Sequence, residues 1–290
     1  MFTGIAAHAN APLERAGTTA VGLMLNLAAH ARGWPFPRGG AGAIAKSLAS
    51  YLRSLGGEIR LGTPVRAPED LPPARVVLWD LTPRQLRAIL GDRIGYAKFR
   101  YGPAVFKMDW ALSGPIPWRA PGAATAATVH LGGSLGEIAD AEAAPARGEH
   151  ARRPYVLLTQ PSLFDPTRAP PGKHVAWAYC HVPHGSNRDM SREIEAQIER
   201  FAPGFRDLVL ARHVRDARTL EAGNANLVGG DINGGEVSLG QLLFRPGPRL
   251  NPYRLPLPGH FLCSSSTPPG PGVHGMGGFH AAQSALLSLR

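Results

Sequence analysis

A glycine-rich turn near the C-terminus constrains this chain more than any other feature. Five of the nine residues from Gly270 to Gly278 are glycine; a predicted strand ending in hydroxyl residues (264–267) precedes them, and a helix-forming run follows. Free N–H groups at such a helix start favour negative charge, and glycine lets the backbone approach a flat ring or a pyrophosphate. The spacing is neither GxGxxG nor a P-loop. From spacing alone, the turn is either a cofactor cradle or a purely structural turn.

The composition is that of a globular protein with one large or two ordinary domains. The chain has 290 residues, of which 44% are hydrophobic and 18% are charged. The formal net charge of +10 suits an anionic partner, but the arginines are scattered and no nucleic-acid motif is present. We therefore expect no nucleic-acid partner, and coding bias accounts for the arginine content.

Cysteine usage and hydropathy predict a cytoplasmic protein. Cys180 and Cys263 lie in apolar, strand-like runs and are predicted to be buried free thiols in a reducing compartment. No run approaches the roughly 18 apolar residues of a membrane span. Residues 15–31 imitate a signal peptide, but Glu14 cancels the charge of Arg15 and Asn26 interrupts the apolar run.

Hydrophobic spacing predicts α/β character at both ends of the chain and a β-rich middle. Near the N-terminus the pattern indicates helices at 17–31 and 41–55, strands at 58–61 and 75–79, and a helix starting at Thr82-Pro83.

Short β-rich runs between 98 and 182 indicate an antiparallel or mixed sheet. An amphipathic helix follows at 190–201, with Ile194, Ile198 and Phe201 on one face. Asn-Gly-Gly at 233–235 favours a hairpin turn over a substrate lid. A last strand begins at His260 and a final helix ends at Arg290.

Three segments in sequence order carry a resemblance to a known family. They are FPRGGAGAIAKSLASYLRSLGGEIRLGTPV from residue 36, VVLWDLTPRQL from residue 76, and PPGPGVHGMGGFHAA from residue 268. Together they resemble the phytoene desaturase family of FAD-dependent oxidoreductases, which is related to the flavin amine oxidases. The resemblance covers nearly the whole chain, and residues 102–118 and 153–183 look like uncharacterised bacterial and mitochondrial relatives rather than carotenoid enzymes.

The resemblance implies FAD as the cofactor and an α/β (α+β) fold. In this fold an incomplete, Rossmann-like FAD-binding domain is interleaved with a β-rich substrate-binding domain that also has helices. The implied boundaries are a helical segment of the substrate domain at 1–35, FAD-domain parts at 36–95 and 251–290, and the substrate domain at 96–250.

The resemblance also implies which residues meet FAD. Arg38, Gly39 and Gly40 would shape a turn near the flavin, the backbone of Val65 would meet the adenine, and Asp80 would hold the loop near the pyrophosphate. The C-terminal motif would line the isoalloxazine and ribityl part with Gly270, Gly272, Val273, Gly275, Met276 and Gly277. Ser265 and Thr267, just before it, are further cofactor-binding candidates.

Histidines are the candidates for acid–base or metal chemistry. His274 lies inside the glycine motif and is either a hydrogen-bonding spacer or a catalytic group. His181 and His184 lack the further ligands of a zinc site, so no metal is expected.

The sequence departs from the family at one point. The family has a strand and a GxGxxG motif at its N-terminus, whereas GAGAIA at 40–45 follows a proline-rich turn. The chain therefore looks like the C-terminal portion of a full enzyme, either as a truncated gene, one half of a split enzyme, or an excised piece. An N-terminal half or a second copy is the expected partner.

The leading functional hypothesis is an FAD-dependent oxidoreductase, cytoplasmic or peripheral to a membrane. It would dehydrogenate or isomerise an apolar, polyene or lipid-like substrate by hydride transfer to the flavin. The alternative is a non-catalytic remnant or partner subunit that binds a lipid or a protein. Amine oxidation is less favoured, because no aromatic pair flanks the C-terminal motif.

Overall fold

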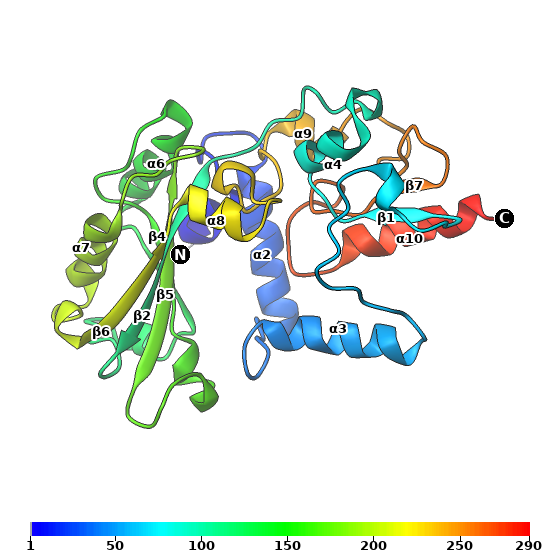
Figure 1. Cartoon of the computed structure of the whole chain (residues 1–290). Helices are drawn as coiled ribbons and strands as arrows, with labels where there is room; N and C mark the ends of the chain where they lie inside the picture. Colours follow the sequence, from blue (N-terminus) through cyan, green and yellow to red (C-terminus); the bar gives the residue numbers. More distant parts are fainter. Residues whose placement is uncertain (1) are drawn as a thin grey trace.

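The computed structural model describes residues 2–290. Figure 1 shows two bodies, one built on a large sheet with helices α6 (Leu135–Ala143) and α7 (Ser191–Phe201), the other around β1 (Val77–Trp79) and β7 (His260–Leu262). Helix α2 (Thr18–Arg32) runs between them. The fold is thus a mixture of helices with parallel and antiparallel sheets, as the sequence predicts.

The larger sheet is antiparallel, with strand order β3-β4-β5-β2-β6. The strands are β2 (Ala104–Leu112), β3 (Thr128–Leu131), β4 (Val156–Thr159), β5 (His174–Val182) and β6 (Val209–Arg215). Four of them confirm the β-rich middle predicted from the sequence. The sequence analysis missed β6, because its VLARHVR residues are mostly exposed and give no alternation of buried and exposed positions.

One face of this sheet packs against α7 and forms the main core. Ile194 and Ile198 are fully buried there, in one cluster with alternate residues of β2 that include Phe106 and Met108. Phe201 packs at the edge of the same core. The predicted amphipathic face of the helix is therefore correct.

The smaller body has a second core around two parallel strands. β1 pairs with β7 in the register Val77 to His260 and Trp79 to Leu262. Helix α4 (Pro83–Leu90) packs Leu86 and Leu90 on this pair. The chain then turns through residues 263–275 into α10 (Met276–Ser288), which ends next to the C-terminus.

The N-terminal helices connect the two bodies. Short helix α1 (Phe2–Ala6) contacts α2, and the Tyr155 hydroxyl on the sheet donates to the Gly4 carbonyl at 2.7 Å. Helix α3 (Gly42–Ser54) buries none of its residues. The remaining short helices are α5 (Pro121–Ala124), α8 (Ala217–Gly223) and α9 (Leu239–Phe244). No helix among residues 2–290 is long and apolar enough to span a bilayer.

Three local predictions need correction. Residues 58–61 pair with no strand among the described residues and so form none, and Val65 also lies in irregular backbone, partly buried against the second core. Cys180 is a buried free thiol, but Cys263 is only partly buried. Thr82 precedes a helix that begins with Pro83, yet its hydroxyl makes no cap.

Three histidines, one buried and two partly buried, lie where the N-terminal segment meets the sheet. The Nε2 atoms of His8 and His130 are 3.0 Å apart, so they share one proton between them. Nearby, His181 Nδ1 lies 2.7 Å from a carboxylate oxygen of Glu142, and both side chains are buried. Burial lowers the pKa of His8 and of His130 to about 4, and for His8 the neighbouring His130 and His181 lower it further.

These depressed pKa values predict that acid weakens the attachment of residues 2–10. The unfolded chain takes up protons near the ordinary histidine pKa of 6.5, whereas the folded pair resists protonation down to about 4. The free energy of unfolding should therefore fall as the pH drops from 6.5 to 4, by up to about 1.4 kcal/mol per pH unit for each extra proton bound by the unfolded state. Urea unfolding at a series of pH values measures this slope.

His130→Phe should reduce the slope, and His174→Phe serves as the control on the same sheet. An unchanged pH dependence in His130→Phe would show that the pair does not carry the effect.

Candidate functional site

The glycine turn leaves the β1–β7 pair at the carboxyl ends of its strands. Gly270, Gly272 and Gly275 have φ angles of +104°, +150° and +64°, which residues with a Cβ rarely adopt. Between them Val273 is 91% exposed. The turn therefore needs its glycines for its own conformation, and it presents its backbone to the surface.

Helix α10 begins in direct contact with the end of β7. A Cβ on Gly277 would lie 3.0 Å from the carbonyl oxygens of Cys263 and Ser264, whereas one on Gly278 would meet nothing within 4 Å. The N-cap, Gly275, offers no side chain to the first-turn amides. The amides of Gly277 and Gly278 remain available to a ligand with negative charge.

His274 makes a local hydrogen bond at this helix start. Its Nδ1 accepts from the N–H of Met276 at 3.0 Å. The ring thus satisfies one of the first-turn donors and fixes the turn. This contact is that of a hydrogen-bonding spacer, and a catalytic role for His274 stays a prediction.

The hydroxyl residues before the turn are bonded mainly to the loop itself. Ser264 accepts from the Ser266 N–H at 2.9 Å, and the fully buried Thr267 donates to the Ser264 carbonyl at 2.7 Å. Ser266 donates to the carbonyl of Gly234 at 2.7 Å. Thr267 therefore shapes the loop from inside, while Ser265 is exposed.

The loop at 231–236 packs under the glycine turn. The buried Asp231 accepts from the N–H groups of Gly102, Asn233 and Gly235 at 2.7 to 2.9 Å. No strand flanks this loop, so the hairpin interpretation of Asn-Gly-Gly is wrong. The loop instead joins the start of β2 to the glycine motif.

Arg245 is a buried cation that the sequence analysis did not single out. It is 1% exposed, and its Nη2 donates to the carbonyls of Gly234 and Asn233 at 3.0 and 3.2 Å. Its Nε and Nη1 have no partner among the described residues. Burial lowers the pKa of Arg245 to about 10, which leaves it charged at neutral pH. An arginine inside the apolar run LLFRPG was the available signal.

Asp80 lies beside the start of the turn, at the carboxyl end of β1. The Cys263 N–H donates to the Trp79 carbonyl at 2.9 Å, which joins the two strand ends. Partial burial raises the pKa of Asp80, and burial together with this nearby carboxylate raises the pKa of the Cys263 thiol to about 12. Ligands of open α/β sheets bind at this end of the strands.

Arg38, Gly39 and Gly40 contact a different part of the chain. The Gly39 N–H donates to Asp165 at 2.6 Å, and Arg168 donates to the Gly39 carbonyl at 2.7 Å. Arg38 lines an open cavity of about 520 Å³ with aromatic side chains of the same two loops. These contacts attach the turn to the large sheet; none joins it to residues 270–278.

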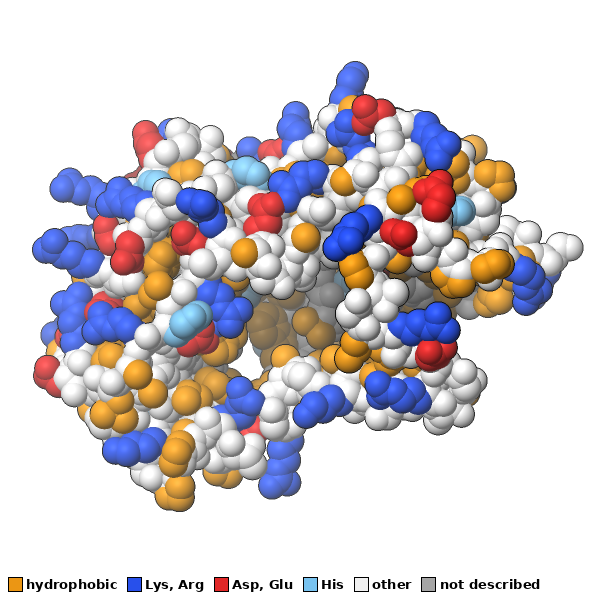
Figure 2. All heavy atoms as spheres, in the orientation of Figure 1, with side chains coloured by type: hydrophobic (Ala, Val, Ile, Leu, Met, Phe, Trp, Pro, Cys, Tyr) orange, Lys and Arg blue, Asp and Glu red, His pale blue; other side chains and the backbone are white. Residues whose placement is uncertain are grey.

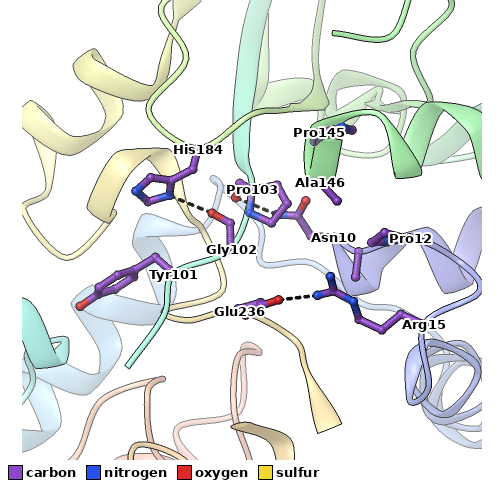
Figure 3. Close-up of a pocket in the computed structure, with 11 residues that line it drawn as sticks. Asn10, Pro12, Arg15, Tyr101, Gly102, Pro103, Pro145, Ala146, His184 and Glu236 are labelled. Carbon is purple, nitrogen blue, oxygen red and sulfur yellow. Dashed lines mark hydrogen bonds and ion pairs between the residues drawn. The ribbon is translucent and has the colours of Figure 1, made fainter. Parts of the chain in front are cut away.

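A smaller cavity of about 230 Å³ lies beside the 231–236 loop (Figure 3). Arg15 and Glu236 form an ion pair at 2.5 Å on one side, and His184 Nδ1 lies 2.9 Å from the Gly102 carbonyl on the other. These polar groups are paired with each other, and no nucleophile contacts a base there. Residues 2–290 contain no group of three metal-ligating side chains.

Comparisons with known proteins find similar chains whose names include the word oxidoreductase. No family model matches the chain. It is 36% identical over 155 residues to pyridine nucleotide-disulfide oxidoreductase domain-containing protein 2 of Mus musculus and 37% identical to that of Rattus norvegicus. The alignments cover 49% of this chain and 26% of each relative, so the chain matches about a quarter of their length.

A solved oxidoreductase from Methanosarcina mazei has the same fold. The TM-score is 0.65 at 14% sequence identity, and the match covers 99% of this chain and 64% of that chain. The two proteins therefore share a fold over the matched part.

Two leucine substitutions test the close contact at the start of α10. Gly277→Leu should lower the free energy of unfolding by about 1–3 kcal/mol, because its side chain must displace the backbone of residues 263 and 264. Gly278→Leu adds the same side chain to open space, so stability should stay equal or rise. Thermal unfolding of both variants measures the difference. Equal stability of the two variants would contradict this account of the contact.

Proposed function

We propose that this chain is an FAD-dependent oxidoreductase and that its glycine turn forms the flavin-facing side of the cofactor site. The observation that carries the proposal is the exposed backbone of residues 270–278 at the start of α10, next to the carboxyl ends of two parallel strands. The similarity to proteins named as oxidoreductases supports it.

The residues at the turn fit such a cofactor. Gly275 borders open space, whereas the His274 ring covers Gly272, and the first-turn amides of Gly277 and Gly278 offer donors to an electron-rich edge. Asp80 lies where a phosphate-binding loop would end. FAD, when bound, supplies a hydride acceptor. The chain's own residues bind it, orient it and keep the local potential positive.

An apolar substrate, polyene or lipid-like, is the class we propose. Leu23, Met24 and Leu27 of α2 are more than half exposed although they lie between the two bodies. Figure 2 shows hydrophobic side chains in the hollow between these bodies. On the large sheet the half-buried rings of Trp177 and Tyr179 stack 6.2 Å apart. These surfaces would also suit contact with a membrane surface that holds the substrate.

The small body further indicates a partner. Two parallel strands alone make a marginal sheet, and parallel sheets normally have both faces covered. Here Leu48 and Tyr51 of α3 and Phe279 and Leu286 of α10 are more than half exposed. We propose that a nucleotide-binding strand–helix unit covers these helices and binds the ADP half of FAD, as an N-terminal half or through a second copy.

The second candidate is a non-catalytic subunit that binds a lipid or a protein. It is favoured by the lack, within residues 2–290, of a strand followed by GxGxxG. A non-catalytic subunit would have the same apolar surfaces but would not bind flavin. Titration with FAD therefore separates the two candidate functions.

FAD titration of the purified chain tests the proposed function. The chain should bind FAD saturably, with quenched flavin fluorescence. Gly278→Trp should weaken binding at least about tenfold, since its bulk stands at the mouth of the turn while its Cβ meets nothing within 4 Å. Gly122→Trp, whose Cβ also meets open space on the short helix α5, is the matched control. No binding by the unaltered chain would favour the non-catalytic candidate.

Self-association in solution tests the proposal that a partner covers the exposed apolar residues of α3 and α10. Without its partner the chain should dimerise or aggregate at micromolar concentration in analytical ultracentrifugation, because the apolar faces of α3 and α10 attract one another. Leu48→Glu should shift the distribution toward monomer. Leu135→Glu, at an equally exposed leucine of α6, should not. A monodisperse monomer for the unaltered chain would contradict the proposal.

A further inference from the structure

Arg245 carries a buried charge that the protein compensates only in part. Its Nη2 bonds to two carbonyls of the 231–236 loop, and the other donors, Nε and Nη1, are unpartnered. The buried Asp231 accepts three backbone N–H groups, and its charge favours the charged form of Arg245. Burying a cation with two unpartnered donors still costs free energy, so a purely structural role would be better met by an apolar side chain.

The free side of the guanidinium faces the glycine turn. A Cβ on Gly270 would lie 3.3 Å from Nη1. Nη1 therefore lies next to the turn, on the side where a side chain at position 270 would stand. A Cβ on Gly235 would lie 2.9 Å from Nη2, which shows how closely the loop encloses the cation. Glycine at both positions is what allows the arginine to lie between the loop and the turn.

Two sources of positive potential therefore converge on residues 270–278. The N-terminus of α10 supplies partial positive charge from one side, and Arg245 supplies a full charge from beneath Gly270. Because Arg245 is itself buried, water screens its charge little, and the charge favours whichever ligand state is more negative.

We propose that Arg245 is a positioning residue of the flavin site, which fixes the 231–236 loop under the glycine turn and favours the reduced, more negative state of the bound flavin. This inference rests on the proposed function. It adds a residue outside the glycine motif to the site. The charge of this residue, and not its packing alone, would set the midpoint potential of the bound flavin.

The test is the midpoint potential of bound FAD, measured by reductive titration against a reference dye, together with the affinity for oxidised FAD. Arg245→Met removes the charge and keeps the length of the side chain. It should lower the affinity for reduced relative to oxidised FAD at least tenfold, a shift of about 30 mV for two electrons. Arg245→Lys should retain most of the wild-type potential. Arg249→Met, on the same segment and stacked on Tyr96, is the control.

Each outcome decides the inference. A wild-type chain that binds no FAD overturns the proposed function and this inference together. Wild-type binding with an unchanged potential in Arg245→Met, even with lower thermal stability, leaves the proposed function intact and shows a purely structural arginine. If Arg245→Met does not fold, Arg245→Gln replaces it, and failure of both to fold also means a structural role.

Discussion

The contact between the first turn of α10 and the end of β7 is the constraint on which the rest of the site depends. Because Gly277 has no Cβ, the helix starts directly on the carbonyls of residues 263 and 264. The intervening chain must then turn back on itself within a few residues, which requires the positive φ angles of Gly270, Gly272 and Gly275. The result is a short, exposed backbone segment beside the carboxyl ends of two parallel strands.

The buried polar residues beneath this segment connect the two bodies of the protein. Asp231 accepts the amide of Gly102 just before β2, and Ser266 and Arg245 both donate to Gly234. A rotation between the bodies would break these bonds or leave charges buried without partners, which is costly. The relation of the large sheet to the glycine turn is therefore fixed by polar contacts, while each body has its own apolar core.

The parts of the fold that could be predicted are those in which a local residue pattern by itself determines the structure. The spacing of Ile194 and Ile198 predicted a buried helix face, and the glycine motif predicted a turn that only glycine can make. The strand at 58–61 failed because pairing depends on a neighbour that the local sequence does not reveal. Arg245 was missed because charged residues are normally exposed, and only the tertiary packing of the 231–236 loop shows that this one is not.

The candidate site was predicted in part for the same reasons. The residues of 270–277 lie together because they are adjacent in sequence, and Asp80 joins them through the β1–β7 register. Gly39, in the turn formed by residues 38–40, contacts Asp165 and Arg168. These residues lie far apart in the sequence, so the spacing of residues along the chain could not predict the contact.

The most direct test of the central claim is to follow the backbone amide signals of the ¹⁵N-labelled chain by NMR while FAD is added. The account predicts that Gly272, Gly275, Gly277 and Gly278 shift first and most, with smaller shifts in the 231–236 loop. Shifts confined to another region, such as the cavity beside Arg15 and His184, would contradict the assignment of the glycine turn as the flavin site.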